Sequence, residues 1–419
     1  MTSNQTQDDT LAQLKAGKLQ GSKQLKLSCG LTKFPPDIFD LADSLEILAL
    51  TGNALSTIPN DLYRLTKLRI LFCSSNQFTH LPEVLGECKN LSMIGFKANQ
   101  IRHIPESAIP TTTLRWFIVT DNVLEALPNT LGECRQLQKL MLAGNQLTTL
   151  PESMANCHAL ELLRISANQF NAIPDFLFDL PNLTWLAYAG NPFCNEIEQH
   201  LIDQHQVNAI DWQTLTLQNV LGQGASGVTY QAMWHPKNQA AEAVAVKLFK
   251  SGLTSDGLPC CELHANILAG EHPNLVGVKG VIHNYPQGTL GLVMPLLDAD
   301  LKVLANPPSF ESCSRDVYSD DLTLTLADAQ HIMFSITNAA KYLHARGLMH
   351  SDLYAHNILW RADKVMSQKA VLSDLGGVSF LPLDNQALTK KLLKLEARAL
   401  EVLSHELISR SEIDSILKR

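Results

Sequence analysis

The sequence has few of the features that mark membrane-spanning or nucleic-acid-binding proteins. Only 18% of its 419 residues are charged, no basic run is present, and the formal net charge is -8. This acidic balance argues against a nucleic-acid surface. No uncharged apolar stretch reaches membrane-spanning length, and the polar start MTSNQTQDDT lacks the apolar segment of a secretory signal. We therefore expect a cytoplasmic globular protein.

The cysteines also lack a recognisable pattern. There are nine, an odd number, and no C-x-x-C pair occurs among them, which argues against a zinc site or a disulfide framework. Cys88, Cys134 and Cys157 recur at equivalent places in a repeat, so we expect them to fill a core as small buried thiols. For the adjacent Cys260 and Cys261, a reactive thiol is the alternative.

A 23-residue repeat, L-x-x-L-x-L-x-x-N, runs from Leu45 to Asn191 without insertion. Its asparagine recurs at 53, 76, 99, 122, 145, 168 and 191, and a proline follows six residues after each of the first six. This is the pattern of a leucine-rich repeat array. We expect each unit to contribute a short strand, and each asparagine to satisfy backbone groups where the chain leaves that strand. Residues 4–26 and about 192–208 are the expected caps.

The outward positions of the expected strands predict a concave face with few charges. Apolar residues exposed in such number imply a partner, because a monomer rarely leaves a patch of this kind in water. Four of these residues, Phe72, Trp116, Arg164 and Trp185, have the composition of a binding hot spot. A protein partner on this face is therefore expected. The alternative is that the second half of the chain folds back on it.

Four motifs follow one another in the second half of the chain. They are LGQGASGVTY at Leu221–Tyr230, VAVK at Val244–Lys247, HSDLYAHNIL at His350–Leu359 and SDLGG at Ser373–Gly377. Strand-like segments at 215–221, 228–233 and 243–249 and a helical stretch at 326–346 surround them. One glycine-rich match is weak evidence, whereas four motifs in this order resemble a protein kinase domain.

Nearly the whole chain resembles a bacterial-type leucine-rich-repeat protein kinase. We expect a multidomain α/β protein: a repeat solenoid with its caps at 1–208, and a bilobal, protein-kinase-like α+β domain with a reduced C-lobe at 211–419. The resemblance implies ATP and Mg²⁺ as cofactors, and transfer to serine or threonine hydroxyls.

The resemblance also assigns roles to individual residues. Asp352, Lys247 and Asn357 are the expected catalytic residues, with Asp352 accepting the proton of the attacking hydroxyl, and Asn357 and Asp374 are the expected Mg²⁺ ligands. Lys247 lies in an apolar strand and needs an anionic partner; Glu262 is the candidate, with Glu242 and Glu271 as alternatives. The expected nucleotide contacts are Leu221, Gly222, Gly224, Ser226, Gly227, Lys247, Glu262, Met294 and Leu296.

Three departures from the kinase pattern leave the function open. Ser351 stands where the arginine of H-R-D is usual, Tyr354 where serine/threonine kinases carry a lysine, and no A-P-E follows Asp374. Losing the lysine is expected to lower the rate, because charge compensation carries much of phosphoryl-transfer catalysis. We favour an active protein kinase that modifies itself or a recruited protein. The alternatives are a nucleotide-binding pseudokinase scaffold and a small-molecule kinase.

Overall fold

The computed structural model describes residues 3–203, 208–224, 226–250, 252–361 and 370–411. Within it the chain divides into two compact units, Met1–Leu183 and Thr184–Arg419. The division therefore falls before the last repeat strand, whereas the sequence-based domains, 1–208 and 211–419, remain a prediction. None of the described helices is long and apolar enough to cross a membrane.

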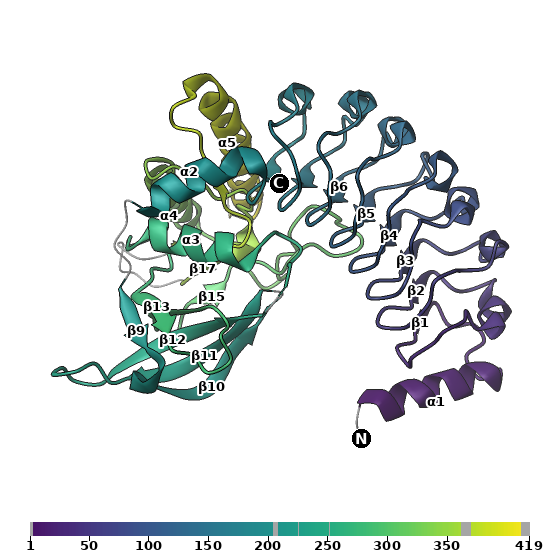
Figure 1. The fold of residues 1–419 in the computed structure, drawn as a ribbon, viewed down its shortest axis with the longest axis horizontal. Coiled ribbons are helices and arrows are strands. Elements are labelled where there is room, and N and C mark those ends of the chain that lie inside the picture. The colour runs from purple at the N-terminus through teal and green to yellow at the C-terminus, as the bar shows by residue number, and fades with distance from the viewer. Residues whose placement is uncertain (1–2, 204–207, 225, 251, 362–369, 412–419) are drawn as a thin grey trace. The chain divides into compact units, whose positions relative to one another are not determined.

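The first unit is a solenoid that begins with helix α1 (Ser3–Lys15), after which each turn contributes one strand and one short 3-10 helix (Figure 1). The strands are β1 (Gln24–Lys26), β2 (Ile47–Ala49), β3 (Ile70–Phe72), β4 (Met93–Gly95), β5 (Trp116–Ile118), β6 (Lys139–Met141) and β7 (Leu162–Arg164). The 3-10 helices are η1 (Pro36–Leu41), η2 (Leu62–Arg64), η3 (Glu83–Glu87), η4 (Glu106–Ala108), η5 (Asn129–Glu133), η6 (Glu152–Asn156) and η7 (Asp175–Asp179). Neighbouring strands pair in parallel at the 23-residue register, with Leu71 between Leu48 and Ile94.

The repeated asparagines hold successive turns of this solenoid together. Asn122 is typical: its Oδ1 accepts from the backbone N–H of Ile101 at 2.9 Å, and its Nδ2 donates to the carbonyls of Phe96 and Val119 at 2.9 and 3.0 Å. Because the side chain is 7% exposed, these bonds satisfy backbone groups that water does not reach. The asparagines of this unit are structural, as the repeat predicts.

The turn before each asparagine imposes a second requirement on the repeat. The preceding residue has a positive φ in every turn of the first unit from β2 onward: Gly52, Ser75, Ala98, Asp121, Gly144 and Ala167. Glycine adopts this conformation without cost, whereas a Cβ adds about 1 kcal/mol or more of strain. Four of the six turns therefore carry some backbone strain.

The three cysteines expected to fill the core are buried in this unit. Cys88, Cys134 and Cys157 are 4%, 0% and 0% exposed, and the thiol of Cys157 donates to the carbonyl of Leu131 at 3.2 Å. Burial raises their pKa values to about 12, 12 and 11. They remain protonated thiols at neutral pH, which disfavours a redox role.

The second unit begins with strand β8 (Trp185–Ala187) and helix α2 (Pro192–Asp203), and then forms a sheet with helices (Figure 1). Its remaining strands are β9 (Ala209–Asp211), β10 (Leu215–Gln223), β11 (Gly227–Trp234), β12 (Glu242–Phe249), β13 (Gly280–His283), β14 (Gly291–Pro295), β15 (Lys302–Val303), β16 (Leu348–Met349), β17 (Ile358–Trp360), β18 (Ala370–Leu372) and β19 (Ser379–Phe380). Its remaining helices are α3 (Pro259–Ala269), α4 (Leu326–His344) and α5 (Gln386–Ser409), with the 3-10 helices η8 (Trp212–Thr214) and η9 (Ala355–Asn357). The main sheet has the order β10-β11-β12-β14-β13-β9.

Strand β12 divides the core of this sheet into two faces. Side chains alternate along a strand, so Val244 and Val246 pack into one cluster with β9, β10 and β13. Ala245 and Phe249 pack into the other cluster with Leu263 of α3. Lys247 lies between Ala245 and Phe249 in the alternation, so its side chain leaves the strand on the α3 side.

Helices α4 and α5 frame the C-terminal part of the unit. Thr325 and Asp328 form a capping box at the start of α4, and Asn385 accepts from the N–H of Leu388 at the start of α5. Along the chain, strand β19, which pairs with β16, is the one strand between Asp374 and α5. Helix α5 is the last helix among the residues that the structure describes, and the reduced C-lobe remains a prediction.

Candidate active site

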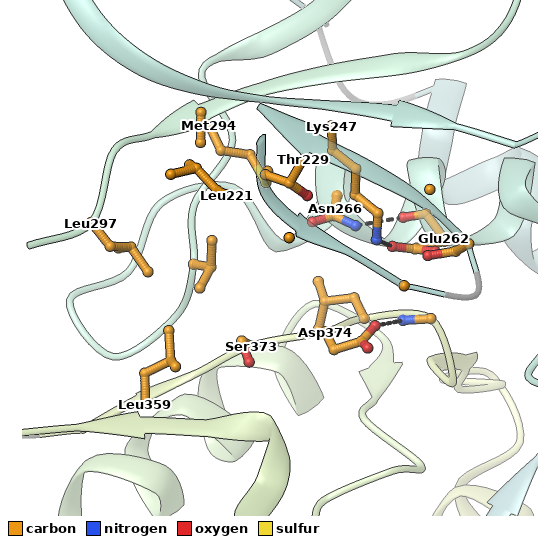
Figure 2. Close-up of a pocket in the computed structure, with 18 of the residues that line it drawn as sticks. Leu221, Thr229, Lys247, Glu262, Asn266, Met294, Leu297, Leu359, Ser373 and Asp374 are labelled. Carbon is orange, nitrogen blue, oxygen red and sulfur yellow. Dashed lines mark hydrogen bonds and ion pairs between the residues drawn. The ribbon is translucent and has the colours of Figure 1, made fainter. Parts of the chain in front are cut away.

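A cavity of about 460 Å³ lies between the main sheet and the segments that follow α4. All nine expected nucleotide contacts line it, as does Asp374. Figure 2 shows that its two ends differ: Leu221, Met294, Leu297 and Leu359 gather at one end, and Lys247, Glu262 and Asp374 gather at the other. The cavity can therefore hold a ligand that is flat and apolar at one end and anionic at the other.

The glycine-rich loop covers this cavity through the hairpin β10–β11. A Cβ added to Gly222 or Gly224 would meet nothing within 4 Å, so open space remains beside both residues. Gly227 is different, because a Cβ there would lie 2.5 Å from the carbonyl oxygen of Leu248 on β12. The first two glycines leave room for a ligand, and the third is required by strand packing.

Lys247 forms an ion pair with Glu262 from α3. The lysine and glutamate side chains are 16% and 3% exposed. Burial raises the pKa of Glu262, the charge of Lys247 opposes that shift, and the charge of Asp374 adds to it. Glu242, one of the two alternatives, pairs instead with Lys279 at 2.8 Å. The structure thus gives Lys247 the partner expected from the motif.

The loop between β16 and β17 brings two expected catalytic residues into contact. The Nδ2 of Asn357 donates to the backbone carbonyl of Asp352 at 2.9 Å and to its carboxylate at 3.1 Å. The hydroxyl and N–H of Ser373 both donate to the carbonyl of Asn357 at 2.8 Å. These bonds join the loop to the segment that carries Asp374, so the three expected polar groups belong to one hydrogen-bonded assembly.

The donors present fit a magnesium ion shared with a nucleotide. Mg²⁺ takes one or two carboxylates from a protein and completes its octahedron with phosphate oxygens and water. Asp374 has the left-handed φ of 55°, and its Oδ1 accepts from the N–H of Gly376 at 3.0 Å. That bond fixes the direction of the carboxylate, and the amide of Asn357 is fixed by its bonds to Asp352.

The site depends on one residue to which the sequence assigned no role. Glu396, 2% exposed in the middle of α5, accepts from the backbone N–H of Ser351 at 2.9 Å and pairs with His344 of α4. Ser351 itself has a φ of 63°. The carboxylate therefore holds the strained residue just before Asp352. The available signal was weak, because the segment LEARALEV contains two glutamates, and the sequence does not show that Glu396 is buried and Glu401 is exposed.

Tyr354 is buried rather than directed toward the cavity. Its side chain is 4% exposed, and its ring stacks on Trp185 with centroids 4.0 Å apart and planes at 15°. Trp185 also donates from Nε1 to the carbonyl of Leu353 at 3.0 Å. Within the second unit, the last repeat strand thus contacts the loop that carries Asp352.

This contact corrects part of the predicted partner face. Trp185 is 1% exposed and Arg164 is 2% exposed, so neither is available as a surface hot spot. The reason for Trp185 is that its indole N–H and ring both have partners in the catalytic loop. Phe72 and Trp116 are partly exposed, and they remain the candidates for a partner surface.

Comparison with known proteins supports both halves of the interpretation. Residues 215–413 match the family described as protein tyrosine and serine/threonine kinase, and residues 135–193 match the leucine rich repeat family. The predicted fold class, a repeat solenoid followed by a kinase-like domain, is thereby confirmed. The bacterial type of the resemblance remains a prediction.

Each of the relatives below aligns with only part of this chain. The probable serine/threonine-protein kinase gdt4 of Dictyostelium discoideum is 30% identical over 171 residues, which are 40% of this chain and 9% of that protein. Cyclin-dependent kinase 10 of Mus musculus is 28% identical over 199 residues, 47% of this chain and 50% of that one. The chain thus spans half or less of the length of these relatives. A solved leucine-rich repeat protein of Leptospira interrogans is 22% identical, covers 45% of this chain and 60% of its own, and has a TM-score of 0.31.

Proposed function

Because this chain joins leucine-rich repeats to a protein kinase domain, we propose that it is an ATP- and Mg²⁺-dependent serine/threonine protein kinase. It phosphorylates itself or a protein held by the repeats. The observation that carries the proposal is the polar end of the cavity, where the buried pair of Lys247 and Glu262 faces Asp374. A buried ammonium held by one carboxylate is suited to bind phosphate oxygens, which provide the further negative charge.

Each residue of the site has a place in the proposed transfer. Lys247 binds the α- and β-phosphates, and Asn357 and Asp374 hold Mg²⁺, which neutralises charge on the phosphates when bound. The acceptor hydroxyl attacks the γ-phosphorus, its proton passes to Asp352, and the bond to the bridging oxygen of ADP breaks. The bond from Asn357 keeps the carboxylate of Asp352 in position.

A nucleotide-binding pseudokinase scaffold is the second candidate, and the burial of Tyr354 favours it. Tyr354 stands where serine/threonine kinases carry a lysine, and its ring is stacked on Trp185. A tyrosine supplies no positive charge to the phosphates. The retained pair of Asp352 and Asn357 favours catalysis instead, and we give this pair more weight because both side chains are held in mutual contact.

The acceptor of the phosphoryl group separates these functions. Purified protein is incubated with ATP labelled at the γ-phosphate, Mg²⁺, generic protein substrates and a pool of small metabolites. Label on serine or threonine of this chain or of the added protein is the expected result. Label on a metabolite identifies a small-molecule kinase, and ATP binding without any label identifies the scaffold. Either of these two results contradicts the proposal.

A further inference from the structure

Helix α2 carries a buried carboxylate that the proposed reaction does not use. By its sequence position this helix is the cap that follows the last repeat, yet it belongs to the second compact unit. Glu198 is 8% exposed, although its neighbours Glu196 and Gln199 are exposed. A buried carboxylate needs partners, and both partners of Glu198 come from α3.

Glu198 binds α3 with both of its oxygens. Its Oε1 accepts from Nδ1 of His264 at 2.6 Å, and its Oε2 accepts from the thiol of Cys261 at 3.6 Å. The hydrogen bond and charge of Glu198 raise the pKa of His264. The protonated imidazole and the carboxylate then form a charge-assisted pair, which is stronger than a neutral hydrogen bond.

The residues of α3 that contact Glu198 and the residue that pairs with Lys247 lie on different faces of this helix. Successive residues of an α-helix are rotated by about 100°, so Cys261 and His264 lie within about 60° of each other. Glu262 lies about 160° from His264, which places it on nearly the opposite face. On that face Glu262 pairs with Lys247. A rotation of α3 that breaks the contacts with Glu198 therefore moves Glu262 relative to Lys247.

The start of α3 has no side-chain cap of its own, although Leu263 packs against the sheet. Leu258 occupies the N-cap position and provides no side-chain hydrogen bond to the first turn. The first six positions of this helix contain Cys261, Glu262 and His264. Glu198 supplies hydrogen bonds to this end of the helix from outside it.

We propose that Glu198 is a positioning residue for nucleotide binding: by holding His264 and Cys261 it fixes the rotation of α3 that presents Glu262 to Lys247. Helix α2 thereby acts on the nucleotide site through α3, although none of its described residues lines the cavity. The consequence for catalysis rests on the proposed kinase function, whereas the consequence for ATP affinity does not.

The test compares two substitutions on α2, each of which replaces a glutamate by the neutral glutamine. Glu198→Gln removes the charged partner of His264, and Glu196→Gln makes the same change at an exposed position of the same helix. The dissociation constant of ATP with Mg²⁺ is measured for the full chain by calorimetric titration. We expect affinity to fall about five- to thirty-fold in Glu198→Gln, the range given by one or two lost polar contacts of ordinary strength, and to stay within twofold in Glu196→Gln.

A double-mutant cycle separates positioning from general destabilisation. In a Glu262→Gln background there is no ion pair left to position, so Glu198→Gln should weaken ATP binding by less than twofold further. A loss of the same size in both backgrounds shows that Glu198 acts independently of Glu262 and overturns the proposal. Unchanged affinity in Glu198→Gln also overturns it.

Two further measurements keep the test decisive. If Glu198→Gln does not fold, His264→Gln removes the same contact from its partly exposed partner. His264→Gln should then give the same loss of ATP affinity, and a loss of less than twofold in the Glu262→Gln background. Phosphate transfer is recorded on each sample. A wild-type chain that binds ATP without transfer contradicts the proposed function while leaving the affinity comparison valid, and a wild type that binds no ATP contradicts both.

Discussion

In the repeat unit each buried asparagine satisfies the backbone of adjacent turns at fixed sequence separations, whereas in the second unit the buried charged pairs join residues at separations that do not recur. Asn76 and Asn122 make the same bonds to residues 21 and 26 positions earlier. Lys247 and Glu262, or His344 and Glu396, occur once each. Stability in the array is therefore divided among equivalent turns, whereas in the second unit it depends on contacts that occur once.

The largest expected effect concerns Glu396, the most deeply placed of these single partners. Glu396→Ala leaves the N–H of Ser351 and the imidazole of His344 without their acceptor, and removing one member of a buried pair costs about 3–5 kcal/mol. Urea unfolding followed by tryptophan fluorescence measures this, because four of the five tryptophans lie in the second unit. Glu401→Gln, exposed on the same helix, is the control and should cost less than about 0.5 kcal/mol. Equal losses of unfolding free energy in Glu396→Ala and Glu401→Gln would contradict the distinction between buried pairs and surface charges.

The next effect is on catalysis. Lys247→Ala removes the ammonium that we propose binds the phosphates, and we expect transfer to fall about 10²–10³-fold, the usual loss when one charge-stabilising donor is deleted. ATP affinity should fall as well, because the proposed contact is already made to bound ATP before transfer. Lys250→Ala is the matched control, since the Nζ of Lys250 donates to the carbonyl of Gly224 from an exposed position. A transfer rate within twofold of wild type in Lys247→Ala would exclude this role.

A smaller effect is expected from one turn of the array. Asn122→Ala leaves the buried N–H of Ile101 and three carbonyls without this partner, at about 1–3 kcal/mol for the buried donor. Asn90→Ala, which loses a single exposed bond to Thr66, should cost about 1 kcal/mol or less. Far-UV circular dichroism during urea unfolding measures both changes. Since the lesion lies in the first unit, ATP affinity should be unchanged; a loss of affinity would show that the two units do not behave separately.

The smallest effect is a stabilisation. Ala98 has a φ of 54° at the position where Gly52 and Gly144 occur in other turns. Ala98→Gly relieves strain of about 1–2 kcal/mol but gains freedom in the unfolded chain, so a net gain of about 0.5–1 kcal/mol is expected. Gly144→Ala should have the opposite sign by a similar amount. Two changes of the same sign would contradict equivalence of the turns.

The two units also differ in how far the sequence predicts them. The 23-residue period predicts strands β2 to β8 and the role of the asparagines, because these depend on contacts at a fixed sequence separation; β1 falls in the segment expected to be the cap. The resemblance to kinases predicts nine of the residues that line the cavity and names Glu262 as the candidate partner of Lys247. Ligands and roles at this site remain proposals.

The sequence does not predict contacts whose two residues belong to different motifs or repeats. Glu396 holds Ser351 across 45 residues, and Trp185 holds Leu353 across 168. Neither separation is repeated, and no motif contains both members. The hot-spot interpretation of Trp185 was wrong because an outward strand position shows which way a side chain points, but not what else in the fold packs against it.

The most direct test of the account compares the wild-type chain with Asp352→Asn. The substitution removes the proposed proton acceptor but keeps a side chain of the same size beside Asn357. We expect transfer of labelled γ-phosphate to fall about 10²–10⁴-fold, the range supplied by a positioned general base. We expect the stabilisation by ATP and Mg²⁺ to persist, about 2.7 kcal/mol at one hundred times the dissociation constant. Transfer that continues at the wild-type rate in Asp352→Asn would contradict the central claim that this cavity is a kinase active site.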